Sequence, residues 1–274
     1  EIHNGADDNA SGVAGLISLA KRFQKEKSSK RSLVFTAFGA EEMGLLGSKY
    51  FIESGLLDRE NIQLMVNMDM IGRFNSEKGL AIGGSGTAVN LETRVDSILS
   101  RTKLDYSFKP EGYGPSDHSS FYVNDIPVLF FFTGAHDDYH TPQDDPEKIN
   151  YRGIKTITDA GFLVVEYFSG MDEKLTYQEA GPKESQVRPA FKVTLGIMPD
   201  YIYSGKGLRV DAVAEYGPAM EAGLVKGDII IEMDGKSVND IYEYMDRLEQ
   251  LKPGMTITVL IDRNGIELEL PVAF

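Results

Sequence analysis

The chain has 274 residues, of which 42 are acidic and 28 are basic, so its formal net charge is −14. The acidic surplus argues against a nucleic-acid partner, because binding to phosphate groups needs a surplus of lysine and arginine. Cysteine is absent, which excludes disulfides, thiolate metal ligands and a cysteine nucleophile, and no apolar run reaches the ~20 residues that span a bilayer.

Helix-like and strand-like stretches alternate over residues 1–172. The apolar spacing predicts, in chain order, a helix over 11–23, strands over 32–38, 63–68 and 126–132, and a closing helix over 154–168. Near-continuous apolar strands between amphipathic helices indicate a mostly parallel sheet that helices cover on both faces. We therefore expect these residues to form an α/β domain.

The composition changes at residues 173–189, a polar stretch that we interpret as a linker. Beyond it, short apolar runs are separated by frequent turns. The spacing predicts a helix over 240–251 with Asn239 as its cap, and Asn264-Gly265 between two apolar runs predicts a β-hairpin. Residues 190–274 are therefore expected to form a small β-rich domain with one prominent helix.

Acidic residues and a histidine follow the strands predicted in the first domain. Glu41 and Glu42 follow the first strand and Asp69 follows the second. His140 follows the third strand, and Asp8 lies where the first helix begins. Because ligands bind at the carboxyl ends of strands in open α/β sheets, we expect these side chains to converge. Carboxylates that lie close together repel unless a cation neutralises them, and a mixture of carboxylate and imidazole ligands suits zinc better than magnesium or calcium.

The two carboxylates of the doublet Glu41-Glu42 can have different chemical roles, because adjacent side chains point in different directions. One carboxylate can bind a metal while its neighbour takes a proton from a metal-activated water and passes it to a leaving amine. Taken alone, the doublet favours a plainer interpretation, in which acidic residues stabilise the positive end of a helix.

Five motifs stand out in chain order: GADDNASG at 5–12, FTAFGAEEMGLLGS at 35–48, NMDMIG at 67–72, SDH at 116–118 and HTPQD at 140–144. Together they resemble the di-zinc aminopeptidase family, which also holds glutamate carboxypeptidases and glutaminyl cyclases. The resemblance implies that Asp8 bridges two zinc ions and that the peptide bond after it is cis. It implies that Glu42 and His140 complete one metal site and that Asp69 contributes to the other.

One part of the family's pattern has no match in this sequence. The second zinc site of the family uses a histidine from a His-x-Asp motif upstream of the bridging aspartate. His3 is followed by Asn4 and Gly5, which does not give that motif. We therefore expect the chain to be truncated at its N-terminus, with a complete ligand set for one zinc here and two zinc ions in the full-length protein. A natural enzyme with one zinc is the alternative.

The motif Ser116-Asp117-His118 has two interpretations. The resemblance implies that it forms a wall of the substrate pocket, to which we also assign Tyr139, whereas the alternative is a hydrogen-bonded loop. The acidic residues around His140 are interpreted as a solvated rim, of which one or two members can orient the imidazole. They are Asp137, Asp138, Asp144, Asp145 and Glu147.

The C-terminal part, residues 190–274, resembles bacterial PDZ domains in stretches such as Leu195-Gly196-Ile197, Gly227-Asp228-Ile229-Ile230 and Lys252-Pro253-Gly254. The resemblance implies that backbone N–H groups at Leu195, Gly196 and Ile197 receive the carboxyl terminus of a peptide. The groove would lie between the following strand and the predicted helix. The alternative is a PDZ fold that packs within its own protein and takes no external peptide.

The resemblance therefore implies a zinc-dependent aminopeptidase that removes N-terminal residues from peptides, with Glu41 as general base, followed by a PDZ domain. One alternative is a one-zinc enzyme similar to glutaminyl cyclases, which share the fold. Another is a non-catalytic module that binds peptides through the PDZ domain, which the intact Glu41-Glu42 pair disfavours. Family and domain pairing favour a periplasmic, cell-surface or secreted location.

Overall fold

The computed structural model describes residues 2–183, 192–200, 203, 205–214 and 217–274, without the side chain of Tyr242. The chain divides into two compact units. The first comprises Glu1–Gly134 and Asp138–Glu184, and the second comprises Ala135–Asp137 and Ser185–Phe274. Each unit is described separately below.

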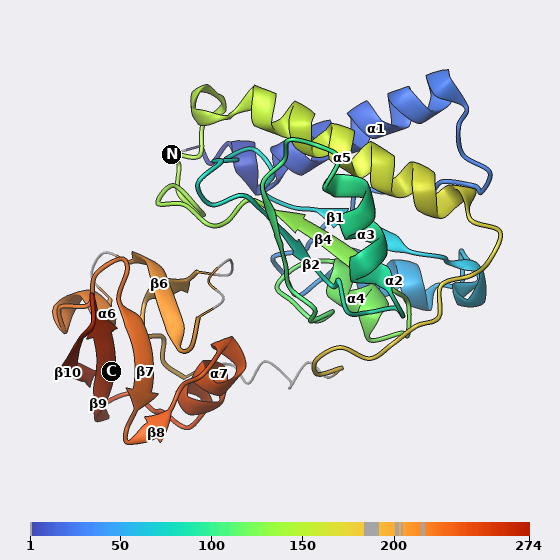
Figure 1. Cartoon of the computed structure of the whole chain (residues 1–274). Helices are drawn as coiled ribbons and strands as arrows, with labels where there is room; N and C mark the ends of the chain where they lie inside the picture. The colour runs from blue at the N-terminus through green and yellow to red at the C-terminus, as the bar shows by residue number, and fades with distance from the viewer. Residues whose placement is uncertain (1, 184–191, 201–202, 204, 215–216) are drawn as a thin grey trace. The chain divides into compact units, whose positions relative to one another are not determined.

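A four-stranded sheet forms the centre of the first unit (Figure 1). Its strands, in the order β1-β4-β2-β3, are β1 (Met65–Met68), β4 (Val128–Phe132), β2 (Leu80–Gly83) and β3 (Tyr106–Phe108). β1 pairs with β4 and β2 pairs with β3 in parallel, whereas β2 and β4 run antiparallel. The sheet is therefore mixed, and the predicted α/β class is confirmed.

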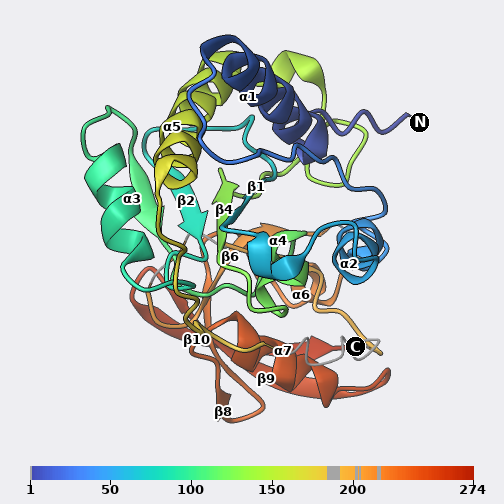
Figure 2. The same ribbon diagram turned by 90° about the vertical axis from the view of Figure 1, so that its right-hand side faces the viewer.

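Helices pack on both faces of this sheet. The α-helices are α1 (Gly12–Glu26), α2 (Leu46–Glu53), α3 (Leu91–Leu99), α4 (His118–Tyr122) and α5 (Tyr151–Gly170), and shorter helical turns are η1 (Ala6–Ser11), η2 (Arg59–Asn61) and η3 (Pro146–Lys148). Alternate residues of β4 point to opposite faces: Leu129 and Phe131 join the core under α1, α3 and α5, whereas Val128 joins the cluster under α2 and α4. Figure 2 shows α1 and α5 side by side on one face and α4 on the other.

Residues 32–38 were predicted to be a buried strand, and this prediction is wrong. The structure assigns no strand there, and Val34 and Phe35 are 57% and 37% exposed. Within the described part of the chain, β1 is an edge strand that pairs only with β4. A groove of about 680 Å³ is lined by residues 31–36 and by residues of β1. An apolar run becomes a strand only when a neighbour supplies backbone hydrogen bonds, and no described strand does so here.

Residues 173–183, the first part of the predicted linker, belong to the first unit. Leu175 is buried in its core, and Tyr177 forms a β-bridge with Ala88. The Tyr122 hydroxyl lies 2.8 Å from the carbonyl oxygen of Ala180 and accepts a hydrogen bond from the Ala180 N–H at 3.0 Å. These contacts fix a stretch whose polar composition predicted a linker. The remaining residues of that prediction, 184–189, lie outside the described residues.

The described residues of the second unit form an antiparallel sheet with two helices, as expected for a β-rich domain (Figure 1). The sheet order is β10-β9-β7-β6-β5, with β8 paired to β7. The elements are β5 (Ile197–Pro199), β6 (Leu208–Val213), α6 (Pro218–Glu221), β7 (Ile229–Met233), β8 (Lys236–Ser237), α7 (Ile241–Glu249), β9 (Thr256–Arg263) and β10 (Ile266–Ala273). Asn264 and Gly265 both have positive φ and connect β9 to β10, which confirms the predicted hairpin.

The start of α7 differs from the prediction by one residue. Asp240, rather than Asn239, accepts a hydrogen bond from the Glu243 N–H at 2.9 Å. The Glu243 carboxylate in turn accepts the Asn239 N–H at 3.0 Å. Asp240 is therefore the cap, and the Glu243 carboxylate accepts the N–H of the residue before the cap, one position earlier than in a standard capping box. No described helix in either unit is long and apolar enough to cross a bilayer.

Candidate metal centre

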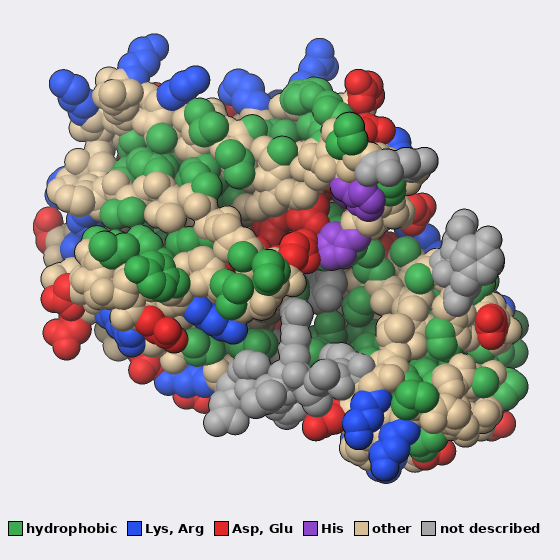
Figure 3. Space-filling model, turned by 180° about the vertical axis from the view of Figure 1, so that it is seen from behind, with side chains coloured by type: hydrophobic (Ala, Val, Ile, Leu, Met, Phe, Trp, Pro, Cys, Tyr) green, Lys and Arg blue, Asp and Glu red, His purple; other side chains and the backbone are tan. Residues whose placement is uncertain are grey.

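Asp8, Glu42 and His140 come from distant parts of the sequence and meet in the first unit. His140 Nε2 lies 2.8 Å from Glu42 Oε1 and 3.1 Å from Asp8 Oδ2. One potential ligand atom of each residue lies within 4.8 Å of the others. Figure 3 shows acidic side chains gathered beside histidines on one face of the molecule. The structure therefore brings together three of the four residues that were predicted to hold metal.

The loop that carries Asp8 is held against the segment after β1. The peptide bond between Asp8 and Asn9 is cis, as the family resemblance implied. The Asn9 side chain donates to the Met68 carbonyl at 3.1 Å and accepts the Met70 N–H at 3.2 Å. The Asp7 carboxylate accepts the Gly72 N–H at 2.6 Å. These hydrogen bonds fix the backbone of Asp8 relative to the end of β1.

Asp69 follows β1 directly and does not belong to the group of three. Ser116 Oγ donates to Asp69 Oδ2 at 2.7 Å, and it accepts a hydrogen bond from the Asn67 side chain at 2.7 Å. Asp69 Oδ1 is buried and has no hydrogen-bond partner among the described residues. Burial raises the pKa of Asp69 to about 7, although the hydrogen bond from Ser116 lowers it. A buried carboxylate oxygen without a partner is costly, and a cation would satisfy it.

Glu41 lies among the other carboxylates of the centre. Burial, and to a smaller extent the negative charges of Asp69, Glu42, Asp117 and Asp8, raise its pKa to about 8. Burial also raises the pKa of Asp8 to about 6, together with the charge of Glu42. This crowding of acids is what a bound cation would relieve, because a positive charge favours the ionised carboxylates.

The donor set of this centre fits zinc. Two carboxylates and one imidazole converge in the group of three, and zinc accepts both kinds of ligand. Magnesium and calcium prefer shells made of oxygen alone. Asp69 Oδ1, which is buried without a hydrogen-bond partner among the described residues, is a further carboxylate oxygen that a cation would satisfy.

Three of the residues assigned to the substrate pocket, Ser116, Asp117 and Tyr139, interact with residues of the candidate metal centre. Ser116 and Asp117 lie at the centre, where Ser116 contacts Asp69 and Asp117 acts on Glu41 through its charge. The Tyr139 ring stacks on the His140 ring at a centroid distance of 3.7 Å.

His118, the third residue of the predicted pocket wall, is buried. It is 1% exposed, and its ring stacks on Phe130 at 4.3 Å. Burial lowers its pKa to about 3, so the ring is neutral. His118 is the first residue of α4, and its side chain lies against Phe130 of β4, away from solvent.

Sequence reasoning missed the roles of Asp144 and Arg73. Asp144 was placed in a solvated rim, but it is 2% exposed and its carboxylate accepts the N–H groups of Asp7 and Asp8 at 2.9 and 3.1 Å. It therefore supports the Asp8 loop rather than His140. Arg73 lies beside it, with Nη2 3.3 Å from Asp144 Oδ1. The sequence did contain one indication of a role for Asp144 at the centre, because Asp144 is the last residue of the HTPQD motif.

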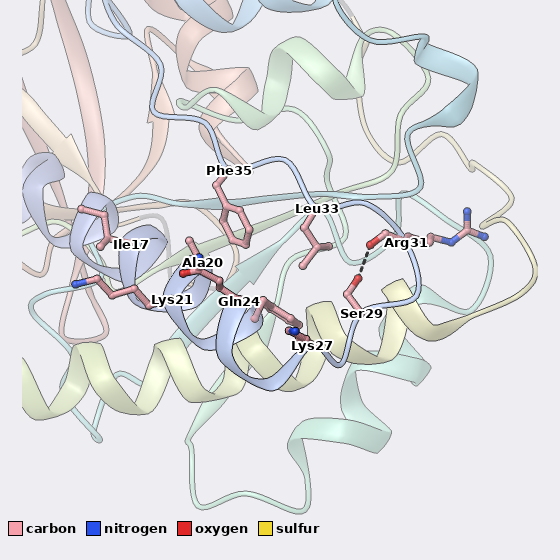
Figure 4. Close-up of a pocket in the computed structure, with 10 residues that line it drawn as sticks. Ile17, Ala20, Lys21, Gln24, Lys27, Ser29, Arg31, Leu33 and Phe35 are labelled. Carbon is pink, nitrogen blue, oxygen red and sulfur yellow. Dashed lines mark hydrogen bonds between the residues drawn. The ribbon is translucent and has the colours of Figure 1, made fainter.

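A separate hollow of about 530 Å³ lies beside α1 and contains none of the candidate metal ligands. Figure 4 shows Leu33 and Phe35 next to Ala20 and Gln24 of α1 in this hollow. Its lining offers no cluster of acids or histidines.

In the second unit, the predicted carboxylate-binding loop is partly occupied by its own contacts. Leu195 is fully buried, and its carbonyl accepts the Ala219 N–H at 2.9 Å. The Gly196 N–H donates to Thr194 Oγ1 at 3.1 Å. Ile197 begins β5, which lies at one edge of the described sheet. No described strand pairs with the outer side of β5, and the Gly196 N–H already has an acceptor.

Comparison with known proteins identifies both units. Residues 1–165 match the sequence profile of peptidase family M28, and residues 186–273 match that of the PDZ domain. The first match covers more than half of the chain, so the chain belongs to peptidase family M28. Both resemblances noted in the sequence are thereby confirmed.

The individual relatives align with only part of this chain, and this chain spans less than two thirds of the length of each. Uncharacterized protein YfbL of Escherichia coli K12 is 29% identical over 196 residues, 60% of each chain. Leucine aminopeptidase 2 of Trichophyton equinum is 33% identical over 141 residues, 48% of this chain and 28% of the relative. The structure of BSAP, a zinc aminopeptidase from Bacillus subtilis, has 26% identity and a TM-score of 0.52, covering 64% of this chain and 43% of that one.

Proposed function

We propose that this chain carries the catalytic centre of a zinc-dependent aminopeptidase, which removes N-terminal residues from peptides. The observation that carries the proposal is the convergence of Asp8, Glu42 and His140 within 4.8 Å in a member of peptidase family M28. The relatives described as a leucine aminopeptidase and a zinc aminopeptidase support the choice of reaction and of metal.

In this proposal, Asp8, Glu42 and His140 hold one zinc ion. Asp8 and Asp69 contribute to a second, and the unpartnered Asp69 Oδ1 is the oxygen available for it. When bound, zinc supplies Lewis acidity, which polarises the scissile carbonyl and makes water a stronger nucleophile.

Glu41 is the general base of the proposed reaction. Its carboxylate takes a proton from the attacking water as the new bond from oxygen to the carbonyl carbon forms. It then gives that proton to the peptide nitrogen as the carbon–nitrogen bond breaks, so the amine leaves neutral. Because the metal-free pKa of Glu41 is about 8, positive charge in the centre is needed to keep this group ionised at neutral pH.

One observation favours a second candidate, a one-zinc enzyme similar to glutaminyl cyclases. Among the described residues, the ligand group consists of Asp8, Glu42 and His140, which make one site. The intact Glu41 suits both candidates, since each needs a proton-transferring carboxylate. It disfavours the third alternative, a module without catalysis.

The test is an assay of the zinc-loaded chain on aminoacyl p-nitroanilides and on peptides that begin with glutamine. Release of p-nitroaniline that a chelator abolishes and zinc restores supports the aminopeptidase. Ring closure of N-terminal glutamine without hydrolysis supports the cyclase candidate. If neither substrate reacts although zinc binds, the non-catalytic alternative is the better one.

The second unit is proposed to bind an extended peptide at the edge strand β5, which has no described strand beyond it. A peptide added there gains main-chain hydrogen bonds. Residues 186–274 hold 9 basic and 14 acidic residues, and 9 − 14 = −5. The negative charge should weaken binding of acidic peptides.

A further inference from the structure

Arg73 contacts two carboxylates that belong to the loops around the candidate metal centre. Its Nη2 atom lies 3.0 Å from Asp138 Oδ2 and 3.3 Å from Asp144 Oδ1. The Arg73 side chain is 17% exposed, and that of Asp144 is 2% exposed. Ion pairs with so little solvent contact are weakly screened by salt. We call these three residues the Arg73 bridge.

On one side, the bridge supports the loop that presents Asp8. Asp144 Oδ2 accepts the N–H groups of Asp7 and Asp8 at 2.9 and 3.1 Å. The main-chain carbonyl of Asp144 accepts the Ala6 N–H at 3.1 Å. The other carboxylate oxygen of Asp144 contacts Arg73. Any shift of the Asp144 side chain would therefore move the backbone from which the Asp8 carboxylate extends.

On the other side, the bridge supports the turn that presents His140. The Asp138 carbonyl accepts the Thr141 N–H at 3.1 Å and the Thr141 hydroxyl at 2.8 Å. Within this turn His140 has a φ of 57°, a left-handed conformation that residues other than glycine adopt rarely. Such a conformation persists only when its surroundings hold it, and Arg73 and Lys148 hold the Asp138 carboxylate.

We infer that Arg73 is a positioning residue that sets the spacing of Asp8 and His140 before a cation binds. The inference rests on the proposed function. Arg73 lies four residues after Asp69, so the bridge connects the segments that carry three of the predicted ligands. Planar guanidinium groups suit this role, because their several N–H groups have fixed directions. Without the bridge, zinc would have to order both loops itself, and its affinity would fall.

The experiment compares the full chain with Arg73→Met and with a matched control, Arg22→Met. Arg22 also contacts two carboxylates, Glu26 at 2.9 Å and Asp159 at 3.1 Å, but in helices α1 and α5. Each metal-free protein is titrated with zinc against a chromophoric chelator, its cobalt(II) absorption spectrum is recorded at saturation, and its unfolding is followed by circular dichroism.

We expect Arg73→Met to weaken zinc binding by about 10–100-fold, the usual effect of losing a residue that orients metal ligands. Its cobalt spectrum should change, because the ligand geometry changes. Arg22→Met should keep the wild-type affinity and spectrum even where its unfolding temperature falls. Arg73→Lys should recover part of the affinity, since one ammonium group can still contact one carboxylate.

Unchanged affinity and spectrum in Arg73→Met would overturn the inference, and so would an equal loss in Arg22→Met. If Arg73→Met does not fold, Asp138→Asn replaces it, and a wild-type affinity in that variant counts against the bridge. If the wild-type chain binds no zinc, the proposed function itself fails. The two failures are therefore distinguishable.

Discussion

Ser116 donates a hydrogen bond to one carboxylate oxygen of Asp69 and leaves the other without a partner. The Ser116 Oγ to Asp69 Oδ2 distance is 2.7 Å, and Asp69 Oδ1 is buried with no hydrogen-bond partner in the described ranges. When a hydrogen bond fixes one oxygen of a carboxylate, the orientation of the second oxygen is also fixed, and that oxygen can bind a cation. This arrangement is suited to a metal ligand, and it makes Ser116 part of the centre.

The first prediction concerns Ser116→Ala. The hydrogen bond lowers the pKa of Asp69, so its loss should raise that pKa and let protons compete better with zinc. A hydrogen bond to a charged group contributes about 1.5–3 kcal/mol, so zinc affinity should fall about tenfold or more near pH 7. Zinc titrations at several pH values measure the effect. Ser97→Ala is the control, because Ser97 is exposed and bonds only within its own helix. Equal affinities in both variants would contradict the role of Ser116.

The second prediction separates the two members of the Glu41-Glu42 doublet. Glu41→Gln should retain zinc and lose about 10²–10⁴-fold in turnover, the usual contribution of a general base. Glu42→Ala should lose zinc as well, because Glu42 Oε1 lies 2.8 Å from His140 Nε2 in the ligand group. Metal analysis and the p-nitroanilide assay distinguish these outcomes. Near-normal turnover by Glu41→Gln would falsify its assignment as the base.

The third prediction is a pH dependence of stability in the metal-free chain. Burial and neighbouring carboxylates raise the pKa of Asp8 to about 6 and that of Glu41 to about 8, and burial raises that of Asp69 to about 7. The folded chain therefore binds more protons at these groups than the unfolded chain, whose carboxyl pKa values lie near ~4. Their contribution to stability is complete below that pH and is lost as pH rises through the folded values.

Thermal unfolding of the metal-free chain between pH 5 and pH 9 should show this loss, and bound zinc should remove most of it. Glu41→Gln removes one titrating group, so its stability should fall less steeply at the upper end of the range. A metal-free chain that becomes more stable as pH rises across this interval would show that the acids are not crowded as the structure has them.

The fourth prediction concerns the second unit. Peptides with a free carboxyl terminus should bind the full chain more tightly than the same peptides with an amide terminus. Because the Gly196 N–H donates to Thr194 Oγ1, Thr194→Ala should free this donor and strengthen binding of the free carboxylate. Calorimetric titration with the paired peptides measures both effects. If amidation changes the affinity of no peptide, the carboxylate loop is assigned wrongly.

Local chemistry was enough to predict part of this protein. The hairpin at Asn264-Gly265 depends on two residues that accept positive φ, which is a property of the dipeptide itself. The helix α5 follows from apolar residues at helical spacing. The motifs around Asp8, Glu42 and His140 were recognisable because a metal site needs particular ligand side chains, and these occur in the chain order of the family that the sequence resembles.

The tertiary structure decided the features that depend on a distant partner. Residues 32–38 have the composition of a buried strand, but pairing with another strand decides whether one forms, and β1 pairs only with β4 among the described strands. His118 is buried because Phe130 lies against its ring. The acidic sequence around Asp144 indicates a solvated rim, yet the Asp144 side chain is buried. Arg73 and the N–H groups of the Asp8 loop offset the cost of burying its charge. A single sequence does not reveal such partners, because a buried charge is stable only where folding brings a matching group to it.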